Sequence, residues 1–171
     1  TLNENILSQW ESLQSVRKRA NEVEQRYENS DLVFNFDLTV TPRFLLLHTI
    51  AHLLIRELES VAGYPAASLK ERIYHSKDNK MAGILIYTAV PDIAGTLGGI
   101  IENAQPREFL KLLSGAFKHA QWCSHDPVCT EHLGQGPGWL NRAACHACAL
   151  LPETSCEFGN VFLDRTFIKG N

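Results

Sequence analysis

Three cysteines and a histidine lie within a short segment near the C-terminal end of the chain, NRAACHACALLPETSC at 141–156. Cys145 and Cys148 form a C-x2-C pair, which supplies two thiolates to a tetrahedral zinc ion from one tight turn. Cys129 and Cys156 extend the pattern to C-x15-C-x2-C-x7-C, and Cys123 precedes Cys129. Three or four ligands in one connected segment predict a metal site, although with a single C-x2-C pair the other ligands must come from separated residues.

Two other interpretations of the cysteines are available. Free cysteines often occupy cores as small apolar residues, but all five lie between 123 and 156, a clustering that packing preference alone does not explain. A redox pair would place Cys145 at a helix N-terminus after a strand, and no such strand precedes it. An odd, clustered set argues against a disulfide framework and favours a reducing cytoplasm with a local metal site. The histidines of this region could substitute as ligands: His125, His132 and His146.

A second group with chemical potential is the pair His48 and His52 in HTIAH. On a helix these residues are one turn apart and share a face. Zinc peptidases use this spacing with a glutamate directly after the first histidine, and Thr49 stands there instead. The alternatives are a metal-dependent hydrolase that uses His48, His52 and Asp92, or histidines that are hydrogen-bonded inside a packed helix. Either way these polar groups must find partners, for which Asp92 and the glycine-rich loop after it are candidates.

Composition limits the classes of protein that can position these residues. With 171 residues, of which 44% are hydrophobic and 20% charged, the chain has material for one core. The net charge of −3 and the pI of about 6.1 exclude a strongly basic surface overall. No apolar run long enough for a membrane span and no secretory leader is visible. The chain starts at Thr1 rather than Met, as expected of a processed product or of a piece of a larger polypeptide.

Periodic apolar residues predict the elements of the N-terminal half. Three- and four-residue steps from Ile6 to Tyr27 predict one amphipathic helix over 3–29. Alternation at Leu32, Phe34, Phe36 and Leu38 predicts a strand over 32–40. Pro42 predicts the first turn of a buried helix that runs to Ala62, after Thr41 as its N-cap and before Gly63.

The second half is predicted to alternate between helices and one strand. Pro65 introduces a short helix over 66–74, and MAGILIYTA at 81–89 predicts a buried strand. A loop with Gly95, Gly98 and Gly99 follows, which either packs tightly or, as a weaker alternative, holds a phosphate. A helix is predicted over 106–120, and the stretch after 159 could be a strand or a short helix.

The order of these motifs resembles the MrfA-type zinc-binding domain, formerly a domain of unknown function. The resemblance runs from about 41 to 168, through LLHTIAHLLIRELESVAGYPAASLKERIY, GILIYTAVPDIAGTLGG, the C-x5-C pair, LNRAACHACALLPETSCE and NVFLDR. The family occurs at the C-terminal side of certain DNA-repair helicases and in phage-defence proteins, and this sequence is similar to members from the DISARM restriction system. Its relatives often carry a D…GGxG segment and a terminal GN…LDK, which here correspond to Asp92, Gly98 and Gly99, and to Gly159, Asn160, Leu163, Asp164 and Arg165.

The resemblance implies one zinc ion held by four thiolates, those of Cys129, Cys145, Cys148 and Cys156, with Cys123 as the alternative to Cys129. Four thiolates leave no open position for water, so the implied role is that of a non-catalytic accessory module and not an enzyme. The resemblance further implies a helicase subunit or helicase domain as partner, possible contact with DNA, no membrane, and a cytoplasmic location. No nucleotide-binding motif occurs in the chain, so any ATPase activity would belong elsewhere.

We therefore expect an α+β fold, with a buried helix, a short sheet and a C-terminal cysteine-rich zinc-binding lobe. The expected division is 1–40, an N-terminal helix and strand packed on the core, and 41–171, the MrfA-type zinc-binding domain. Contact with DNA would require clustered positive charge, although solvated surface residues are the commoner explanation of such groups. Two candidate clusters are Lys70, Arg72, Lys77 and Lys80 near one loop, and Arg142 and Arg165 near the zinc.

Overall fold

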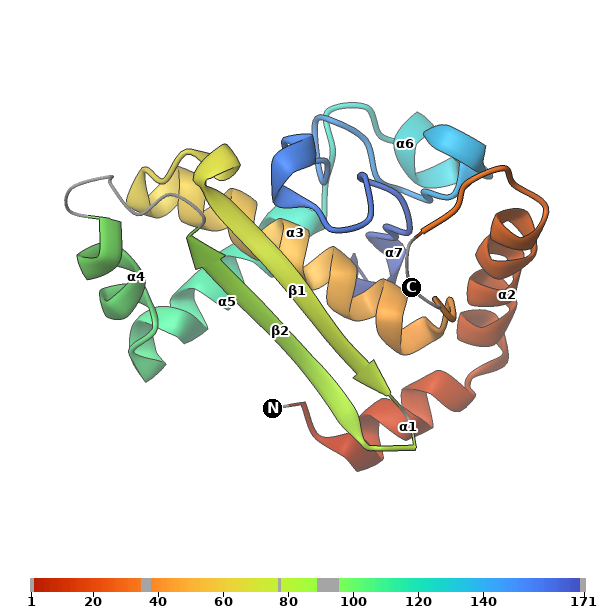
Figure 1. Ribbon diagram of the computed structural model, residues 1–171, viewed down its shortest axis with the longest axis horizontal. Helices are drawn as coiled ribbons and strands as arrows, with labels where there is room; N and C mark the ends of the chain where they lie inside the picture. The colour runs from red at the N-terminus through yellow and green to blue at the C-terminus, as the bar shows by residue number, and fades with distance from the viewer. Residues whose placement is uncertain (1, 35–37, 77, 89–95, 170–171) are drawn as a thin grey trace.

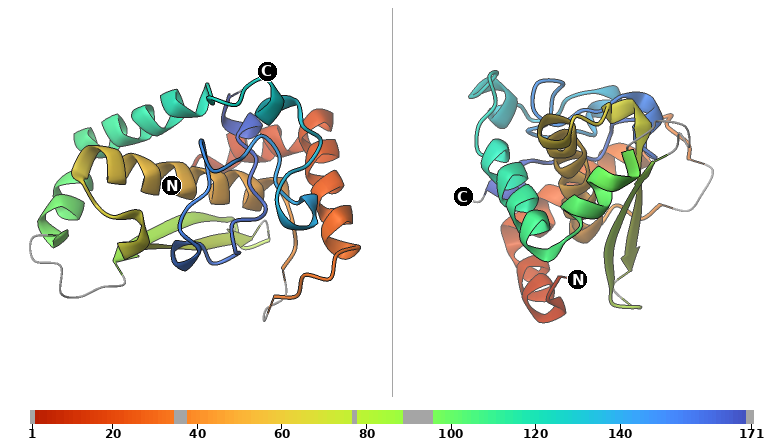
Figure 2. Two further views of the ribbon diagram at one scale, coloured as in Figure 1. Left: turned by 90° about the horizontal axis from the view of Figure 1, so that it is seen from above. Right: turned by 90° about the vertical axis from the view of Figure 1, so that its left-hand side faces the viewer.

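A long helix lies at the centre of the molecule. The computed structural model describes residues 2–34, 38–76, 78–88 and 96–169. Helix α3, Pro42–Ala62, is packed between a two-stranded hairpin on one side and helix α5 on the other (Figures 1 and 2). Its ends are as predicted: the Thr41 hydroxyl accepts a hydrogen bond from the N–H of Phe44 at 3.1 Å, and Gly63 ends the helix at φ +70°. Residues on nearly every side of α3 are buried, because it is covered on several faces.

The described strands form one antiparallel hairpin. Strand β1, Leu69–Ser76, pairs with β2, Met81–Thr88, in a register that joins Leu69 to Thr88. The predicted short helix over 66–74 is wrong beyond a single 3-10 turn at Ala66–Ser68. The residues of β1 alternate between buried and exposed, with Leu69, Glu71 and Ile73 facing α3, so burial with period two overrides their helix propensity.

Strand β2 coincides with the predicted strand at 81–89 over its described residues, 81–88, but the prediction that it is buried is wrong. Its inner residues, such as Ile84 and Ile86, are half-buried against α3, whereas Leu85 on the outer face is 45% exposed. No element covers that outer face within the described residues (Figure 1). The continuous run of apolar residues in β2 is typical of a strand that is covered on both faces, whereas the described elements cover the hairpin on one face only.

The N-terminal segment forms two helices rather than one. Helix α1, Glu4–Ser12, and helix α2, Gln14–Glu28, meet at Leu13, whose ψ of 132° breaks the helix. Val16, Ala20 and Val23 of α2 are buried as expected. The predicted strand over 32–40 is absent from its described residues, 32–34 and 38–40. Leu32, Phe34 and Leu38 nevertheless pack against the core, and residues 35–37 lie outside the described part.

Buried ion pairs attach this N-terminal segment to the rest of the fold. The Arg43 side chain, 1% exposed, donates to both Glu4 and Glu11 of α1. Arg19 of α2 pairs with the buried Asp164 near the C-terminus, and Glu22 pairs with Arg142. Burial raises the pKa of Asp164, and the hydrogen bonds and charge of Arg19 only partly offset this.

Helix α5 covers the other face of α3, and helix α4 packs against α5. Helix α5, Pro106–Ala120, corresponds to the predicted helix and buries Leu112, Ala116 and Ala120. Helix α4, Thr96–Asn103, occupies part of the predicted glycine-rich loop, so Gly98 and Gly99 are helical. The alternative that this loop holds a phosphate therefore has no support in the described residues. Gly95 and Asp92 lie outside them.

The C-terminal lobe is built mainly from loops and single turns. It contains α6, Val128–Glu131, 3-10 turns at Pro137–Trp139 and Glu153–Ser155, and α7, Thr166–Lys169. Its interior is a cluster of cysteine, alanine and leucine side chains. The predicted α+β class, with a buried helix, a short sheet and a C-terminal cysteine-rich lobe, is confirmed. Among the described helices, none is long and apolar enough to cross a membrane.

Candidate metal centre

Four thiols converge in the C-terminal lobe. Cys123 follows the end of α5, Cys129 lies in α6, and Cys145 and Cys148 belong to one turn. The Sγ atoms of Cys123 and Cys145 are 3.6 Å apart, and Cys148 Sγ lies 3.8 Å from both Cys129 Sγ and Cys145 Sγ. Zn–S bonds of about 2.3 Å in a tetrahedron separate the sulfur atoms by about 3.8 Å. None of the five cysteines forms a disulfide, so these thiols have the spacing that a zinc ion requires.

The structure brings together three of the four predicted ligands. Cys129, Cys145 and Cys148 share the cluster, and its fourth member is Cys123, not Cys156. Cys156 Sγ instead lies 3.3 Å from His48 Nε2, beside α3. Helix α5 ends at Ala120, three positions before Cys123, and this places the Cys123 thiol beside the C-x2-C turn. Cys123 and Cys129 are therefore both in the cluster, whereas the sequence offered Cys123 only as an alternative ligand to Cys129.

The thiols could not all ionise without a cation. Burial raises the pKa of Cys129 to about 11; the hydrogen bond from the Gln135 amide lowers it, and the neighbouring thiols Cys145 and Cys123 raise it. Burial likewise raises the pKa of Cys148. Burial alone would raise the pKa of Cys145, but the backbone N–H of Ala147 and the ring of His125 lower it to about 7. A divalent ion would balance the mutual repulsion of four thiolates, so the donor set fits zinc.

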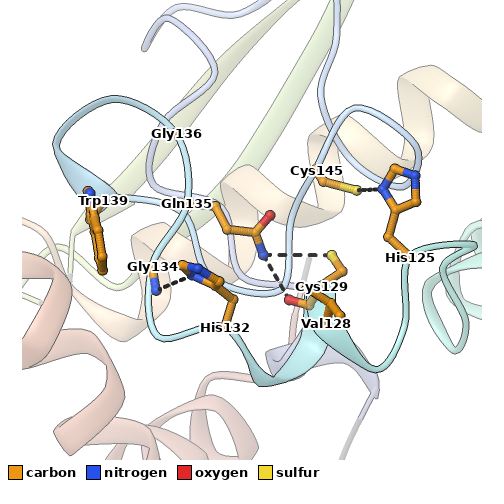
Figure 3. A pocket seen from close by; sticks show the side chains of 9 residues that line it. All are labelled: His125, Val128, Cys129, His132, Gly134, Gln135, Gly136, Trp139 and Cys145. Carbon is orange, nitrogen blue, oxygen red and sulfur yellow. Dashed lines mark hydrogen bonds between the residues drawn. The ribbon is translucent and has the colours of Figure 1, made fainter.

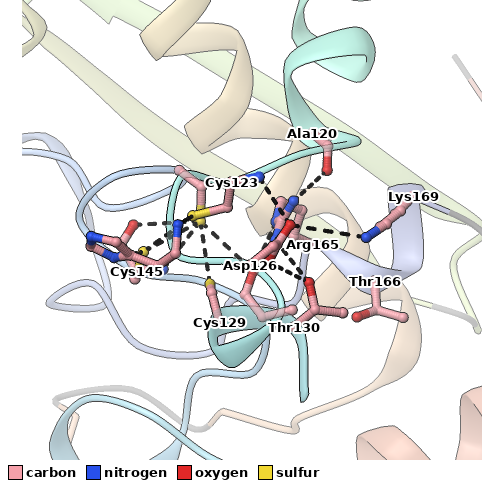
Figure 4. Close-up of polar contacts among 12 residues, drawn as sticks. Ala120, Cys123, Asp126, Cys129, Thr130, Cys145, Arg165, Thr166 and Lys169 are labelled. Atoms are coloured by element: carbon pink, nitrogen blue, oxygen red, sulfur yellow. Dashed lines mark hydrogen bonds and ion pairs between the residues drawn. The ribbon is translucent and has the colours of Figure 1, made fainter. Parts of the chain in front are cut away.

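A buried arginine supports the loop that carries two of these thiols. Arg165 is 0% exposed, and Figure 4 shows its side chain among the carbonyl of Ala120 and the side chains of Asp126 and Thr130. Its guanidinium lies 2.7 Å from Asp126 Oδ1, 2.9 Å from the Ala120 oxygen and 3.2 Å from the Ala143 oxygen. Asp126 Oδ2 in turn accepts the N–H of Cys123. Arg165 therefore connects the end of α5, the 123–130 loop and the segment before Cys145.

A cavity of about 470 Å³ lies beside the thiol cluster (Figure 3). His125 Nδ1 is 3.5 Å from Cys145 Sγ at one side of it, and the Gln135 amide donates to the Cys129 carbonyl at 2.8 Å. Of the histidines considered as substitute ligands, His125 and His146 lie beside Cys145. His132 packs against Trp139, with the two ring planes tilted by 54°. With four sulfurs already within reach of one another, none of them is needed for a tetrahedron.

The pair His48 and His52 forms a separate cluster with Glu71 and Cys156, and all four side chains are buried. Glu71 Oε1 lies 2.9 Å from His48 Nε2 and 3.2 Å from His52 Nε2. Burial would lower the pKa of His48, but the charges of Glu71 and Cys156 outweigh burial and raise it to about 9. Asp92, which the sequence offered as the partner of both histidines, lies outside the described residues.

Sequence reasoning did not single out Glu71. It lies on the inward face of β1, in a segment expected to be helical. The signal that could have found it is the alternation of Leu69, Glu71 and Ile73, which places an acid at a core position opposite two histidines.

A compact α+β fold whose loops converge on four thiols with tetrahedral spacing defines a zinc-binding domain. Residues 50–149 match the MrfA Zn-binding domain family, and because this is more than half of the chain, the chain belongs to that family. The matched range contains Cys123, Cys129, Cys145 and Cys148 and excludes Cys156.

The chain is also similar to a DISARM protein. It is 42% identical over 125 residues to "DISARM protein DrmB" of Bacillus paralicheniformis, an alignment that covers 73% of this chain. The chain spans 22% of the length of that relative.

Proposed function

We propose that the chain is a zinc-stabilised, non-catalytic accessory module of a larger cytoplasmic protein in helicase-associated antiphage defence. The observation that carries this proposal is the spacing of the sulfur atoms of Cys123, Cys129, Cys145 and Cys148, 3.6–3.8 Å for the three pairs in contact. A zinc ion bound there would connect the end of α5 and the 123–129 loop to the 145–148 turn. The similarity to a DISARM protein supports the setting in phage defence.

The ligand set includes no water, and this favours a structural role for the zinc ion. Four thiolates complete a tetrahedron, whereas catalytic zinc sites keep a position open for water or substrate. A hydrolase based on His48 and His52 is not favoured either. Both imidazoles are 0% exposed, so substrate does not reach them in this conformation.

We propose that the module docks on its partner through the outer face of the hairpin. This face carries Lys70, Arg72, Tyr74, Met81, Leu85 and Tyr87, in a register that sets Lys70 beside Tyr87 and Arg72 beside Leu85. Tyr74, Met81, Leu85 and Tyr87 are 39–45% exposed, so apolar and aromatic groups are presented to solvent in one row. Exposed apolar patches with a charged margin are typical of protein interaction sites.

Contact with DNA would involve the same face rather than the arginines near the zinc. The prediction that Arg142 and Arg165 form a DNA-binding surface is wrong, because these side chains are 8% and 0% exposed and pair with Glu22 and Asp126. Lys70, Arg72 and Lys80 of the other predicted cluster are at least partly exposed, whereas Lys77 lies outside the described residues.

Metal analysis of the purified protein tests the zinc-dependent role. We expect Cys148→Ser to lose the thiolate-bound zinc and to unfold at lower denaturant concentration than the unchanged protein. A well-folded protein whose bound zinc is unaffected by both Cys148→Ser and Cys123→Ser would overturn the proposal.

Co-purification of the full-length protein with the helicase component of the same defence system tests docking. Leu85→Lys should weaken this association, because it places a charge in the centre of the apolar row. Val61→Lys is the matched control, since Val61 is 63% exposed at the end of α3 and away from the hairpin face. Equal association of both variants would refute docking through this face. Salt-sensitive retention of DNA that is lost in Arg72→Glu, with helicase association unchanged, would assign the face to DNA instead.

A further inference from the structure

We propose that His48, His52, Glu71 and Cys156 form a second metal site, which binds a zinc ion separately from the four-thiolate cluster. These side chains come from α3, from β1 and from the segment after the 3-10 turn at Glu153–Ser155. Their potential ligand atoms all lie within 4.8 Å of one another, and each residue is at most 9% exposed.

The distances in this cluster are close to those of ligands around one ion. His48 Nε2 is 2.9 Å from Glu71 Oε1 and 3.3 Å from Cys156 Sγ, and His52 Nε2 is 3.2 Å from Glu71 Oε1. Tetrahedral zinc with bonds of about 2.0–2.3 Å separates such nitrogen, oxygen and sulfur atoms by about 3.3–3.6 Å. These three distances are therefore only a few tenths of an ångström shorter than those around a bound zinc ion.

The two imidazoles are oriented so that their Nε2 atoms, and not their Nδ1 atoms, point into the cluster. His48 Nδ1 faces the Phe162 carbonyl at 3.3 Å, and His52 Nδ1 faces the Ala149 carbonyl at 2.8 Å. A carbonyl oxygen only accepts, so each Nδ1 carries a proton. Both Nε2 atoms face the same carboxylate oxygen, Glu71 Oε1, at 2.9 and 3.2 Å. One ion between them could bind both rings together with this oxygen, and the backbone carbonyls would fix the ring orientation, as is common around metal-bound histidines.

Glu71 supplies an independent observation. Its second carboxylate oxygen, Oε2, is buried and has no hydrogen-bond partner within the described residues. A buried oxygen without a partner destabilises the fold, because it has lost its hydrogen bonds to water and gained none. A carboxylate that binds a metal through both oxygens would satisfy this atom.

The contacts of Cys156 and the charges of the cluster also support a bound metal ion. Cys156 Sγ accepts backbone N–H groups from Phe158 at 3.3 Å and from Asn160 at 3.2 Å, an arrangement that suits a metal-bound thiolate. The carboxylate of Glu71 and the thiolate of Cys156 together carry two negative charges, which one divalent ion would neutralise in this buried site. Two nitrogens, one sulfur and a carboxylate are ligands that zinc accepts readily.

The consequence of such an ion would be structural. It would connect the centre of α3 to β1 and to the 156–162 segment, whose Phe158 and Phe162 pack against Phe44. The thiolate cluster joins other loops, so the two ions would stabilise different halves of the C-terminal lobe.

Zinc stoichiometry of the full-length protein, measured by elemental mass spectrometry against protein concentration, tests this site. We expect about two zinc ions for each copy of this domain, and about one in Glu71→Gln and in Cys156→Ser. Glu57→Gln is the matched control, because Glu57 is another buried glutamate of this core but bonds His119 outside the cluster; it should keep both ions. Cys123→Ser run in parallel should also keep about one ion, this time in the second site.

X-ray absorption at the zinc edge of the unchanged protein decides the question even if the variants fail to fold. Two occupied sites give an average of about 2.5 sulfur ligands for each zinc and about 1.5 to 2 nitrogen or oxygen ligands, depending on whether Glu71 binds through one oxygen or both, whereas the four-thiolate site alone gives sulfur only. One ion with only sulfur ligands would overturn the second site and leave the proposed zinc module intact. One ion with mixed ligands would support the second site and refute the four-thiolate site.

Discussion

Arg165 should be among the most sensitive positions in the protein, and Arg165→Met tests this. The substitution keeps a long side chain of similar volume but removes the charge and all the donors. In the structure this leaves the Asp126 carboxylate with only the partly exposed Lys169, 4.0 Å from its Oδ2, as a cation, and the carbonyls of Ala120 and Ala143 without this donor (Figure 4).

The magnitude follows from burial. Arg165 is 0% exposed, and the side chain of Asp126 is 12% exposed, so water replaces little of what is lost. Breaking a buried ion pair by removing one partner costs about 3–5 kcal/mol. We therefore expect Arg165→Met to lower the free energy of unfolding by about 3–5 kcal/mol.

Urea unfolding at pH 7 of the zinc-loaded protein measures the effect. The control is Lys111→Met, because Lys111 pairs with Glu108 at 2.8 Å but is 73% exposed. An exposed pair of this kind contributes about 0.2–1 kcal/mol. A loss below about 1 kcal/mol for Arg165→Met would show that Arg165 does not hold the 123–130 loop in the way the contacts indicate.

Three further substitutions test other features of the fold by the same unfolding measurement. Arg43→Met should cost about 3–5 kcal/mol, because it leaves the buried Glu11 without its cation, whereas Arg72→Met, 58% exposed, should cost less than about 1 kcal/mol; equal losses would contradict this. Gly63→Ala should cost about 1 kcal/mol, because φ is +70° there while an added Cβ meets no atom, and an unchanged stability would contradict the conformational argument. Gly115→Ala should cost about 1–3 kcal/mol despite its helical position, because the new Cβ would come within 2.8 Å of Glu57 Cδ; a stabilised variant would show that Glu57 moves aside freely.

The sequence predicted elements well where local chemistry marks both ends. Helix α3 begins at Pro42 after the Thr41 cap and ends before Gly63, and each of these signals acts within a few residues. The predictions from sequence were wrong where packing between distant elements determines the secondary structure. β1 contains Lys70, Glu71 and Arg72, which favour helices in isolation, and only the contact with α3 makes an alternating strand more stable.

The candidate site shows the same division. Clustering of the cysteines was visible in the sequence, but spacing along the chain does not tell which thiols meet. Cys123 reaches the C-x2-C turn because α5 ends against the C-terminal lobe, and Cys156 is directed to His48 by the path of the following segment. Both positions depend on how elements distant in the sequence pack together, and the number of residues between the cysteines does not predict either of them.

The two N-terminal helices limit how far the protein can be shortened for laboratory work. Arg19 and Glu22 of α2 supply the partners of the buried Asp164 and Arg142. A fragment that starts at Pro42 would remove the ion-pair partners that α2 supplies to Asp164 and Arg142, and would expose the apolar side of the core that α2 covers. Anyone who designs a minimal fragment for crystallisation or labelling should therefore retain the residues before Pro42, even though they contribute no sulfur ligand.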